Sequence, residues 1–267
     1  MTDKRGTGRT ALITGASSGI GLELARLFAG DGYRLIVSAR RTAALEQLAA
    51  ELKGRHGTEV TVIAQDLSRP GAAGALAAAI EGAWLTVDVL VNNAGIGLAG
   101  NLAGNDPAAL TGMLQLNVVA LTELTRLLLP GMLQRRQGRI LNVGSLTGYQ
   151  PGGPGMAAYY ASKGYVLSLS RGLARELRGS GVTVTALCPG TTATEFEQTA
   201  GAVKTRLYRI LKPMSAAVVA RAGYEAMHRG VVSCVPGWLN RILAFGGELP
   251  PRQIAIEINR FLLGDAG

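Results

Sequence analysis

The chain has few of the residues on which disulfide-rich and metal-dependent proteins rely. Only two of its 267 residues are cysteine, Cys188 and Cys234, and only two are histidine, His56 and His228. A disulfide framework needs more cysteines, and a chain of this length buries roughly three-quarters of its unfolded surface without one. No group of cysteine, histidine and carboxylate residues has metal-ligand spacing. We therefore expect two buried thiols and no metal.

Aromatic residues and long apolar runs are also scarce. Aromatics make up 5% of the chain, and no apolar run reaches the length of about eighteen residues that a membrane-spanning helix needs. The first residues are polar and charged, without the apolar stretch of a secretory signal. We expect a cytoplasmic protein without a membrane span.

Positive charge is in excess, with 27 lysine and arginine residues against 18 acidic ones. These cations are mostly isolated, and the sequence contains no basic run, zinc finger or RNA-binding signature. We therefore expect no nucleic-acid partner. The net charge of +9 fits a solvated basic surface with a modest attraction for anionic ligands.

Short apolar runs alternate with longer stretches of helical spacing. The spacing predicts strands at residues 10–14, 34–39, 59–64, 87–92, 138–144, 182–187 and 231–235. It predicts helices at residues 20–30, 42–56, 71–83, 108–136, 157–179 and 216–229. This alternation indicates right-handed crossovers and a doubly wound α/β fold, with a mostly parallel sheet between two layers of helices. No linker divides residues 1–267, so we expect a single domain.

Three segments interrupt the alternation. Residues 96–107 form a loop of small and amide residues, and residues 189–214 form a long stretch that is first threonine-rich and then basic. Long irregular segments in compact domains are often lids, so we expect residues 189–214 to form the substrate loop. Residues 236–267 end in a short amphipathic stretch, for which a packed cap is favoured over contact with a membrane surface.

A glycine-rich turn, Thr14-Gly15-Ala16-Ser17-Ser18-Gly19-Ile20-Gly21, links the first predicted strand to the first helix. Gly15 permits a tight turn, Gly19 lets the backbone approach a pyrophosphate, and Gly21 lets the helix pack closely on the strand. The N–H groups of the helix start, with the hydroxyls of Ser17 and Ser18, can bind phosphates. Because this turn opens a βαβ unit, it predicts dinucleotide binding rather than a purely structural turn.

The ends of the next two strands predict which dinucleotide is bound. The second strand ends in Ser38-Ala39-Arg40-Arg41, without the acidic residue that usually binds the ribose of NAD. The guanidinium of Arg40 suits a 2′-phosphate and predicts NADP(H), whereas Arg41 could equally be solvated. After the third strand comes Asp66-Leu67, where Asp66 could bind the adenine amino group or act as a turn cap.

Tyr159 and Lys163 lie four residues apart in a predicted helix and so share one face. A phenol ionises about three units above neutral pH, and a neighbouring ammonium would supply part of the roughly 4 kcal/mol needed to form the phenolate. Tyr159 is thus a candidate proton donor or acceptor. A tyrosine and a lysine at this spacing are, however, often an ordinary helix surface. Tyr160 is a rival for the proton, and packing is its favoured role.

Two polar residues complete the candidate site. Ser145 follows a strand ending in Asn142-Val143-Gly144, at the sheet edge where doubly wound folds bind ligands, and its hydroxyl could polarise a substrate oxygen. Asn117 lies in an otherwise apolar helix, where its amide needs a partner. It could hold a water that links Lys163 to solvent.

Taken together, these residues resemble the short-chain dehydrogenase/reductase family in order and spacing. The resemblance covers nearly the whole chain and rests on Thr14-Gly15, Gly19-Ile20-Gly21, Asn92-Asn93-Ala94-Gly95, Asn117, Ser145, Tyr159, Lys163, Pro189-Gly190 and Thr194. It implies a Rossmann-type sheet of seven strands and makes Asn117, Ser145, Tyr159 and Lys163 a catalytic tetrad. It also implies that Asn93 binds the cofactor and anchors a strand, that Thr192 and Thr194 lie near the nicotinamide carboxamide or the phosphates, and that the protein is a homodimer or homotetramer.

The resemblance predicts an NADP(H)-dependent oxidoreductase that interconverts a carbonyl and an alcohol on a mostly apolar small molecule. A non-catalytic nucleotide-binding protein would be expected to have lost Tyr159 or Lys163, and the sequence retains both. Epimerases and dehydratases of the same fold usually carry an extra substrate domain. We expect residues 96–102, 146–150 and 156, and the segment after Gly190, to line the substrate pocket.

Overall fold

A seven-stranded parallel sheet forms the centre of the computed structural model, which describes residues 4–194, 212–249 and 251–264. The strand order is β3-β2-β1-β4-β5-β6-β9. Each strand therefore sits where right-handed crossovers place it in a doubly wound fold. The strands are β1 (Thr10–Thr14), β2 (Arg34–Ala39), β3 (Val60–Ala64), β4 (Val89–Asn92), β5 (Gly138–Val143), β6 (Val182–Leu187) and β9 (Ser233–Cys234).

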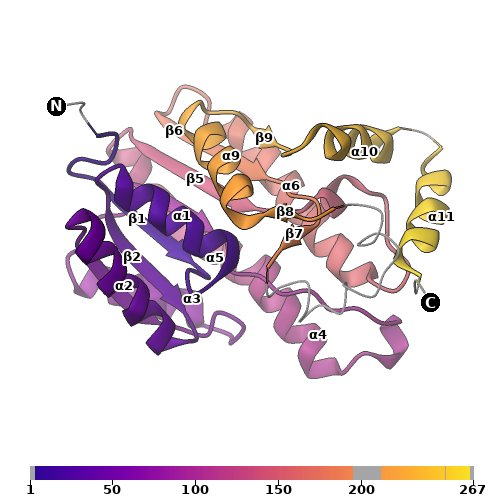
Figure 1. The fold of residues 1–267 in the computed structure, drawn as a ribbon, viewed down its shortest axis with the longest axis horizontal. Coiled ribbons are helices and arrows are strands. Elements are labelled where there is room, and N and C mark those ends of the chain that lie inside the picture. Colours follow the sequence, from indigo (N-terminus) through magenta and orange to yellow (C-terminus); the bar gives the residue numbers. More distant parts are fainter. Residues whose placement is uncertain (1–3, 195–211, 250, 265–267) are drawn as a thin grey trace.

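Helices cover both faces of this sheet (Figure 1). One face packs against α1 (Gly19–Gly30), α2 (Thr42–His56) and α9 (Ala216–His228). The other face packs against α3 (Ala72–Gly82), α5 (Leu121–Gln134) and α6 (Ala157–Glu176). Alternate residues of β1 point to opposite faces of the sheet. Ala11 and Ile13 pack against α1, α2 and α9, and Leu12 packs against α3, α5 and α6. This burial on both faces explains why the strands read as continuous apolar runs.

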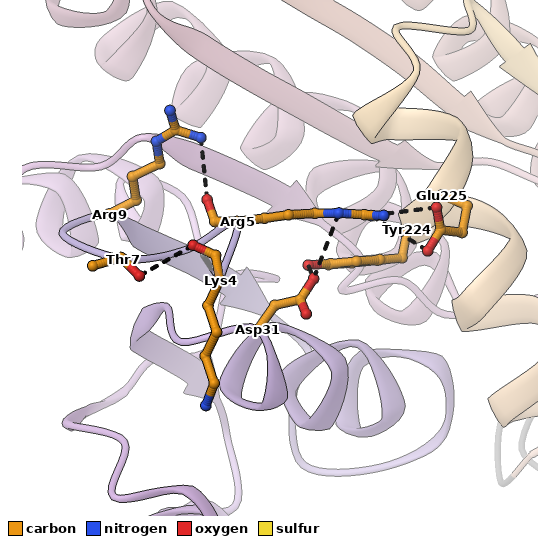
Figure 2. Close-up of polar contacts among 7 residues, drawn as sticks. All are labelled: Lys4, Arg5, Thr7, Arg9, Asp31, Tyr224 and Glu225. Atoms are coloured by element: carbon orange, nitrogen blue, oxygen red, sulfur yellow. Dashed lines mark hydrogen bonds and ion pairs between the residues drawn. The ribbon is translucent and has the colours of Figure 1, made fainter. Parts of the chain in front are cut away.

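The segment before β1 is tied to α1 and α9 by a polar cluster (Figure 2). Arg5 pairs with Glu225 at 3.3 Å and lies 4.0 Å from Asp31, while the hydroxyl of Tyr224 donates to Asp31. Exposed pairs of this kind contribute little stability each. Helices α1 and α9 themselves pack through buried apolar residues, among them Phe28 and Tyr224, whose rings lie 4.8 Å apart.

The predicted helix over residues 108–136 is divided into three parts. It consists of α4 (Pro107–Leu114), a π-helical segment η2 (Gln115–Ala120) and α5. Such π-segments arise where an extra residue is accommodated in the helix, and they are frequent at functional sites. The helical spacing of the sequence runs through this segment without a proline or glycine to mark it.

The region predicted as an irregular substrate loop contains a second, small sheet. Strand β7 (Thr192–Ala193) pairs in parallel with β8 (Met214–Ser215). Residues 195–211 of the predicted loop lie outside the described residues, so its role as a lid stays a prediction. The loop over residues 96–107 includes one short turn of 3-10 helix, Leu102–Gly104.

The C-terminal piece forms two helices, α10 (Trp238–Glu248) and α11 (Arg252–Leu263), where only one short amphipathic stretch was expected. Figure 1 shows both at the end of the molecule away from α2. Leu243 and Ala244 of α10 pack on the turn after β5, as a cap would.

Among the described residues, the helical stretch Pro107–Gln134 is long and apolar enough to cross a membrane by length and composition alone. Polar residues such as Asn117 and Glu123 divide it in the sequence, so it contains no unbroken apolar run of that length. Its residues Ala120, Leu124 and Met132 are buried in the core on one face of the sheet, which is the packing of a helix that belongs to the domain.

Candidate active site

The glycine-rich turn lies at the carboxyl edge of the sheet, between β1 and α1. Gly15 and Gly19 have φ angles of +67° and +57°, a backbone conformation that favours glycine. Helix α1 begins at Gly19, and the side chain of its N-cap residue, Ser18, makes no capping hydrogen bond to the first N–H groups. These N–H groups and the positive end of the helix dipole thus remain available to an anion.

Asn93 holds this turn against the end of β4. Its Nδ2 donates to the carbonyl oxygens of Thr14 at 2.9 Å and Gly15 at 3.1 Å. The hydroxyl of Thr14 in turn accepts the backbone N–H groups of Asn93 and Ala94, each at 3.0 Å. The two strand ends are thereby locked together at the point where the strand order reverses, which is where doubly wound folds bind ligands.

Gly21 lies beneath the turn, and replacing it with alanine should destabilise the protein by a few kcal/mol. A Cβ there would lie 2.4 Å from both Asn93 Nδ2 and the Gly15 carbonyl oxygen, and such overlap forces backbone shifts that cost about 1–3 kcal/mol. The matched control is Gly172→Ala in α6, where an added Cβ meets nothing within 4 Å. This substitution should raise the free energy of unfolding by about 0.5–1 kcal/mol. Urea unfolding measures both; equal effects would show that Gly21 is not a packing requirement.

Two arginines and a carboxylate lie at the outer end of the crevice. Arg40 and Arg41 are exposed and line the cavity described below. Arg41 Nη2 reaches the hydroxyl of Ser17 at 3.3 Å, so this side chain contacts the glycine turn itself. Asp66 uses one oxygen to accept the N–H and hydroxyl of Ser68, as in the turn-capping alternative. Burial opposes its ionisation, but the hydrogen bonds from Ser68 and the charge of Arg40 leave its pKa below the usual value.

Tyr159 and Lys163 lie on the inner face of α6, at the bottom of the crevice. Both are almost completely buried, and the Nζ atom of Lys163 lies 5.9 Å from the centre of the Tyr159 ring. Nζ donates to the carbonyl oxygen of Val143 at 3.1 Å. Burial lowers the pKa of Lys163 to about 8, which still leaves most of the ammonium protonated at neutral pH.

Asn117 lies in the π-helical segment, behind Gly95. Its Oδ1 accepts the N–H of Ile96 at 3.0 Å, and its Nδ2 donates to the Ile96 carbonyl at 2.9 Å and to Ser162 at 3.2 Å. A Cβ on Gly95 would lie 3.2 Å from Asn117 Oδ1 and 3.4 Å from Lys163 Nζ. The glycine thus leaves space in which the amide and the ammonium approach each other.

Ser145 follows β5, directly across the crevice floor from β6. Its hydroxyl caps the short helix Leu146–Tyr149 by accepting the N–H of Thr147 at 3.2 Å. The backbone here is tied to β6 through the hydrogen bond from Leu146 N to the Pro189 carbonyl at 2.7 Å. Gly144 packs against the buried thiol of Cys188. A Cβ atom added to Gly144 would lie only 3.2 Å from the Cys188 sulfur. Burial raises the pKa of that thiol to about 12, so it is neutral.

These elements enclose one cavity of about 800 Å³. Two of the predicted site residues do not line it: Gly21 packs beneath the turn and Asn117 lies behind Gly95. The others all do, namely Gly15, Ser17, Ser18, Gly19, Ile20, Arg40, Arg41, Asp66, Leu67, Asn93, Ala94, Gly95, Ser145, Tyr159, Lys163, Pro189, Gly190, Thr192 and Thr194.

Comparison with known proteins decides which family this geometry belongs to. The model of the short chain dehydrogenase family matches residues 9–204. The chain belongs to this family. Short chain dehydrogenases are oxidoreductases that use a nicotinamide cofactor and act on small molecules, and the glycine turn at the start of α1, where the N-cap Ser18 makes no side-chain cap hydrogen bond, fits such a group.

Relatives and solved structures of the family agree with this assignment. The chain is 40% identical over 186 residues to the oxidoreductase UcpA of Salmonella typhimurium, covering 69% of each chain. It is also 40% identical over 186 residues to sulfoacetaldehyde reductase of Chromohalobacter salexigens, covering 69% of this chain and 72% of that one. A short-chain dehydrogenase from Sphingobium yanoikuyae, solved in complex with NADPH, is similar with a TM-score of 0.80 at 34% identity, covering 90% of this chain and 92% of its own.

The family model ends before the cavity is complete. Part of the cavity wall comes from α10 and α11, which the sequence did not predict as part of the site. The lining residues there are Ile242, Leu243, Gly246, Gly247, Leu249, Pro251, Ile254, Ala255, Ile258, Asn259, Leu262 and Leu263. One signal was present, since apolar residues at 254, 258 and 262 have helical spacing with the amide of Asn259 among them. Of the predicted loop 96–102, only Ile96 and Gly97 line the cavity.

Proposed function

We propose that this short chain dehydrogenase is an NADP(H)-dependent enzyme that interconverts a carbonyl and an alcohol on a mostly apolar small molecule. The observation that carries the proposal is that Tyr159 and Lys163 lie in the same cavity as the glycine-rich turn. A proton-transfer group and a phosphate-binding turn within one crevice are what hydride transfer to a carbonyl requires.

The residues of the tetrad divide the chemistry between them. A bound nicotinamide supplies or accepts the hydride. The hydroxyl of Tyr159 gives a proton to the substrate oxygen during reduction and takes it back during oxidation, and the ammonium of Lys163 favours the phenolate. The hydroxyl of Ser145 donates to the same oxygen. Asn117 fixes the backbone at Ile96 and, as expected from the sequence, we assign it a water that links Lys163 to solvent.

Preference for NADP(H) follows from Arg40, with Arg41 as a second candidate for the 2′-phosphate. Replacing Arg40 with aspartate should change the ratio of kcat/KM for NADPH and NADH by about 10- to 100-fold in favour of NADH. A charge-assisted hydrogen bond worth about 1.5–3 kcal/mol would be lost, and the new carboxylate would repel the phosphate.

Arg34→Asp is the matched control, because it makes the same charge change at the exposed opposite end of β2. Its cofactor ratio should stay at the wild-type value. A ratio that is unchanged in Arg40→Asp would place the phosphate contact elsewhere, with Arg41 as the next residue to replace.

The activity itself is tested with purified protein and a panel of apolar ketones, aldehydes and secondary alcohols, by following NADPH absorbance in both directions. Oxidation or reduction of at least one compound with net change in NADPH is expected. Product formation without net change in NADPH would instead indicate an epimerase or a dehydratase.

We also propose that the enzyme is a homodimer or homotetramer built through the helices that carry Asn117 and Tyr159. Apolar side chains are exposed along these helices, which supports the proposal. They are Leu114, Val119, Leu127, Leu133 and Tyr165, each 37–47% exposed. Sedimentation equilibrium measures the assembly.

A further inference from the structure

The part of the cavity bounded by α11 contains two polar groups to which the tetrad assigns no role. The surrounding wall is apolar, with Ile254, Ala255, Ile258 and Leu262 lining this part. They are Tyr160 and Asn259, which are 5% and 6% exposed and line the same cavity, with the less buried Gln150 beside Asn259. A buried polar group in an apolar wall is costly unless something binds it.

Asn259 is held in one orientation. Its Nδ2 donates to the carbonyl oxygen of Gly152 at 2.7 Å and lies 3.5 Å from Oε1 of Gln150. Because Nδ2 must face a carbonyl acceptor, the amide cannot be flipped. Its Oδ1 accepts no hydrogen bond from any residue in the described ranges. The side chain therefore offers the cavity a fixed acceptor.

Tyr160 offers a donor. Burial raises its pKa, so the phenol stays protonated, and none of the residues that the structure describes hydrogen-bonds to its hydroxyl. Its ring lies flat against the chain at Gly153, where a Cβ would be 2.4–2.6 Å from the Cε2, Cζ and Cδ2 atoms. Only glycine fits there, so this position of the ring depends on Gly153.

The two side chains contact adjacent residues of the segment before α6. Asn259 binds the carbonyl of Gly152, and Tyr160 packs on the next residue, Gly153. Leu263, one turn after Asn259 in α11, packs in a cluster with Tyr159 and Tyr160. Asn259 therefore lies one helical turn, about 5–6 Å along α11, from the residue that contacts this tyrosine cluster.

We propose that Tyr160 and Asn259 form a second polar subsite that binds a hydroxyl group of the substrate, remote from the carbon that reacts. The inference rests on the proposed function and adds to it a substrate class, namely bulky apolar ketones or alcohols that carry a second, distal hydroxyl. A hydroxyl both donates and accepts, so it pairs with the oxygen of Asn259 and the phenol of Tyr160 at once. A carboxylate would accept from Tyr160 but face the oxygen of Asn259 with no proton to donate.

Three matched ketones test the subsite: 4-cyclohexylcyclohexanone, its 4′-hydroxy derivative and the methyl ether of that derivative. The wild-type enzyme should show a KM about tenfold lower for the hydroxy ketone than for the unsubstituted one, as two hydrogen bonds of ordinary strength would give. The kcat values should be similar, because the distal hydroxyl does not touch the reacting atoms. The methyl ether can still accept a hydrogen bond from Tyr160 but has no proton to donate to Asn259. Its KM should therefore lie between those of the hydroxy and unsubstituted ketones.

The variants are Tyr160→Phe and Asn259→Leu, and the measured quantity is the ratio of kcat/KM for the hydroxy and unsubstituted ketones within each variant. Taking this ratio cancels any general loss of activity or folding. It should fall about threefold or more in each. Tyr165→Phe is the control. It removes a phenolic hydroxyl from the same helix, but this hydroxyl contacts Thr122 and Tyr165 does not line the cavity. The ratio for this variant should therefore match that of the wild type.

Two results overturn different statements. Turnover of these ketones with equal KM values for the hydroxy and unsubstituted compounds, or a wild-type ratio in both variants, overturns the subsite and leaves the proposed function intact. No turnover of any ketone, aldehyde or alcohol in the wider panel overturns the proposed function itself.

Discussion

Replacing Tyr159 with phenylalanine should lower kcat about a thousandfold while leaving the dissociation constant for NADPH within about twofold of the wild type. General acid–base catalysis by a positioned side chain contributes about 10²- to 10⁴-fold. The substitution removes only the hydroxyl, and the ring stays buried in the cluster formed with Met113, Met156 and Tyr160. Single-turnover kinetics and NADPH fluorescence titration measure the two quantities separately.

The neighbouring tyrosine supplies the control, because Tyr160 was the rival for the proton. Tyr160→Phe should lose no more than about tenfold in kcat/KM, since it gives up at most a binding hydrogen bond. Loss of turnover in Tyr160→Phe with retention in Tyr159→Phe would reverse the assignment. Equal loss of turnover and NADPH binding in Tyr159→Phe would mean that the residue serves the structure of the cofactor site instead of the chemistry.

The fold was predictable because the inner strands of the sheet, β1, β4, β5 and β6, are buried on both faces. Continuous apolar runs, punctuated by glycine, placed all seven strands of the main sheet to within a few residues. The π-helical segment at Asn117 was not predictable from local periodicity, and the side chain of Asn117 within it binds Ile96, twenty-one residues earlier in the chain. Contacts over such separations leave no trace in local periodicity.

The inner half of the candidate site was predictable for a related reason. In a parallel sheet all carboxyl ends lie at one edge, so the residues that follow β1, β4 and β5 must meet there. The outer half was not, because α10 and α11 come after the last strand and no sheet register fixes where they pack. Their apolar residues predicted an amphipathic cap, but only the structure brings Asn259 to Gly152 and the cavity.

Replacing Lys163 with methionine should lower kcat/KM for alcohol oxidation at pH 7 by about a hundredfold or more. Without the ammonium near its ring, the Tyr159 phenol loses the charge that favours its ionised form, and each unit of lost acidity corresponds to about 1.4 kcal/mol. The loss should shrink as the pH rises towards 10, because hydroxide then forms the phenolate unaided. A pH–rate profile from pH 6 to 10.5 tests this, and a deficit that is constant with pH would show that Lys163 acts only by holding the cofactor.

The same variant should be more stable than the wild type at neutral pH. Burial lowers the pKa of Lys163 from 10.5 to about 8, so the unfolded chain binds a proton more tightly than the folded one. Below pH 8 the buried ammonium therefore opposes folding by about 3 kcal/mol, and this penalty disappears as the pH rises from 8 to 10.5. Urea unfolding of the cofactor-free proteins should show a gain of about 2–3 kcal/mol for Lys163→Met at pH 7 and little difference above pH 10.5. A variant that is less stable at pH 7 would mean that the hydrogen bond from Nζ to Val143 outweighs the cost of burying the charge, and that the ammonium is retained for structure as well as for proton transfer.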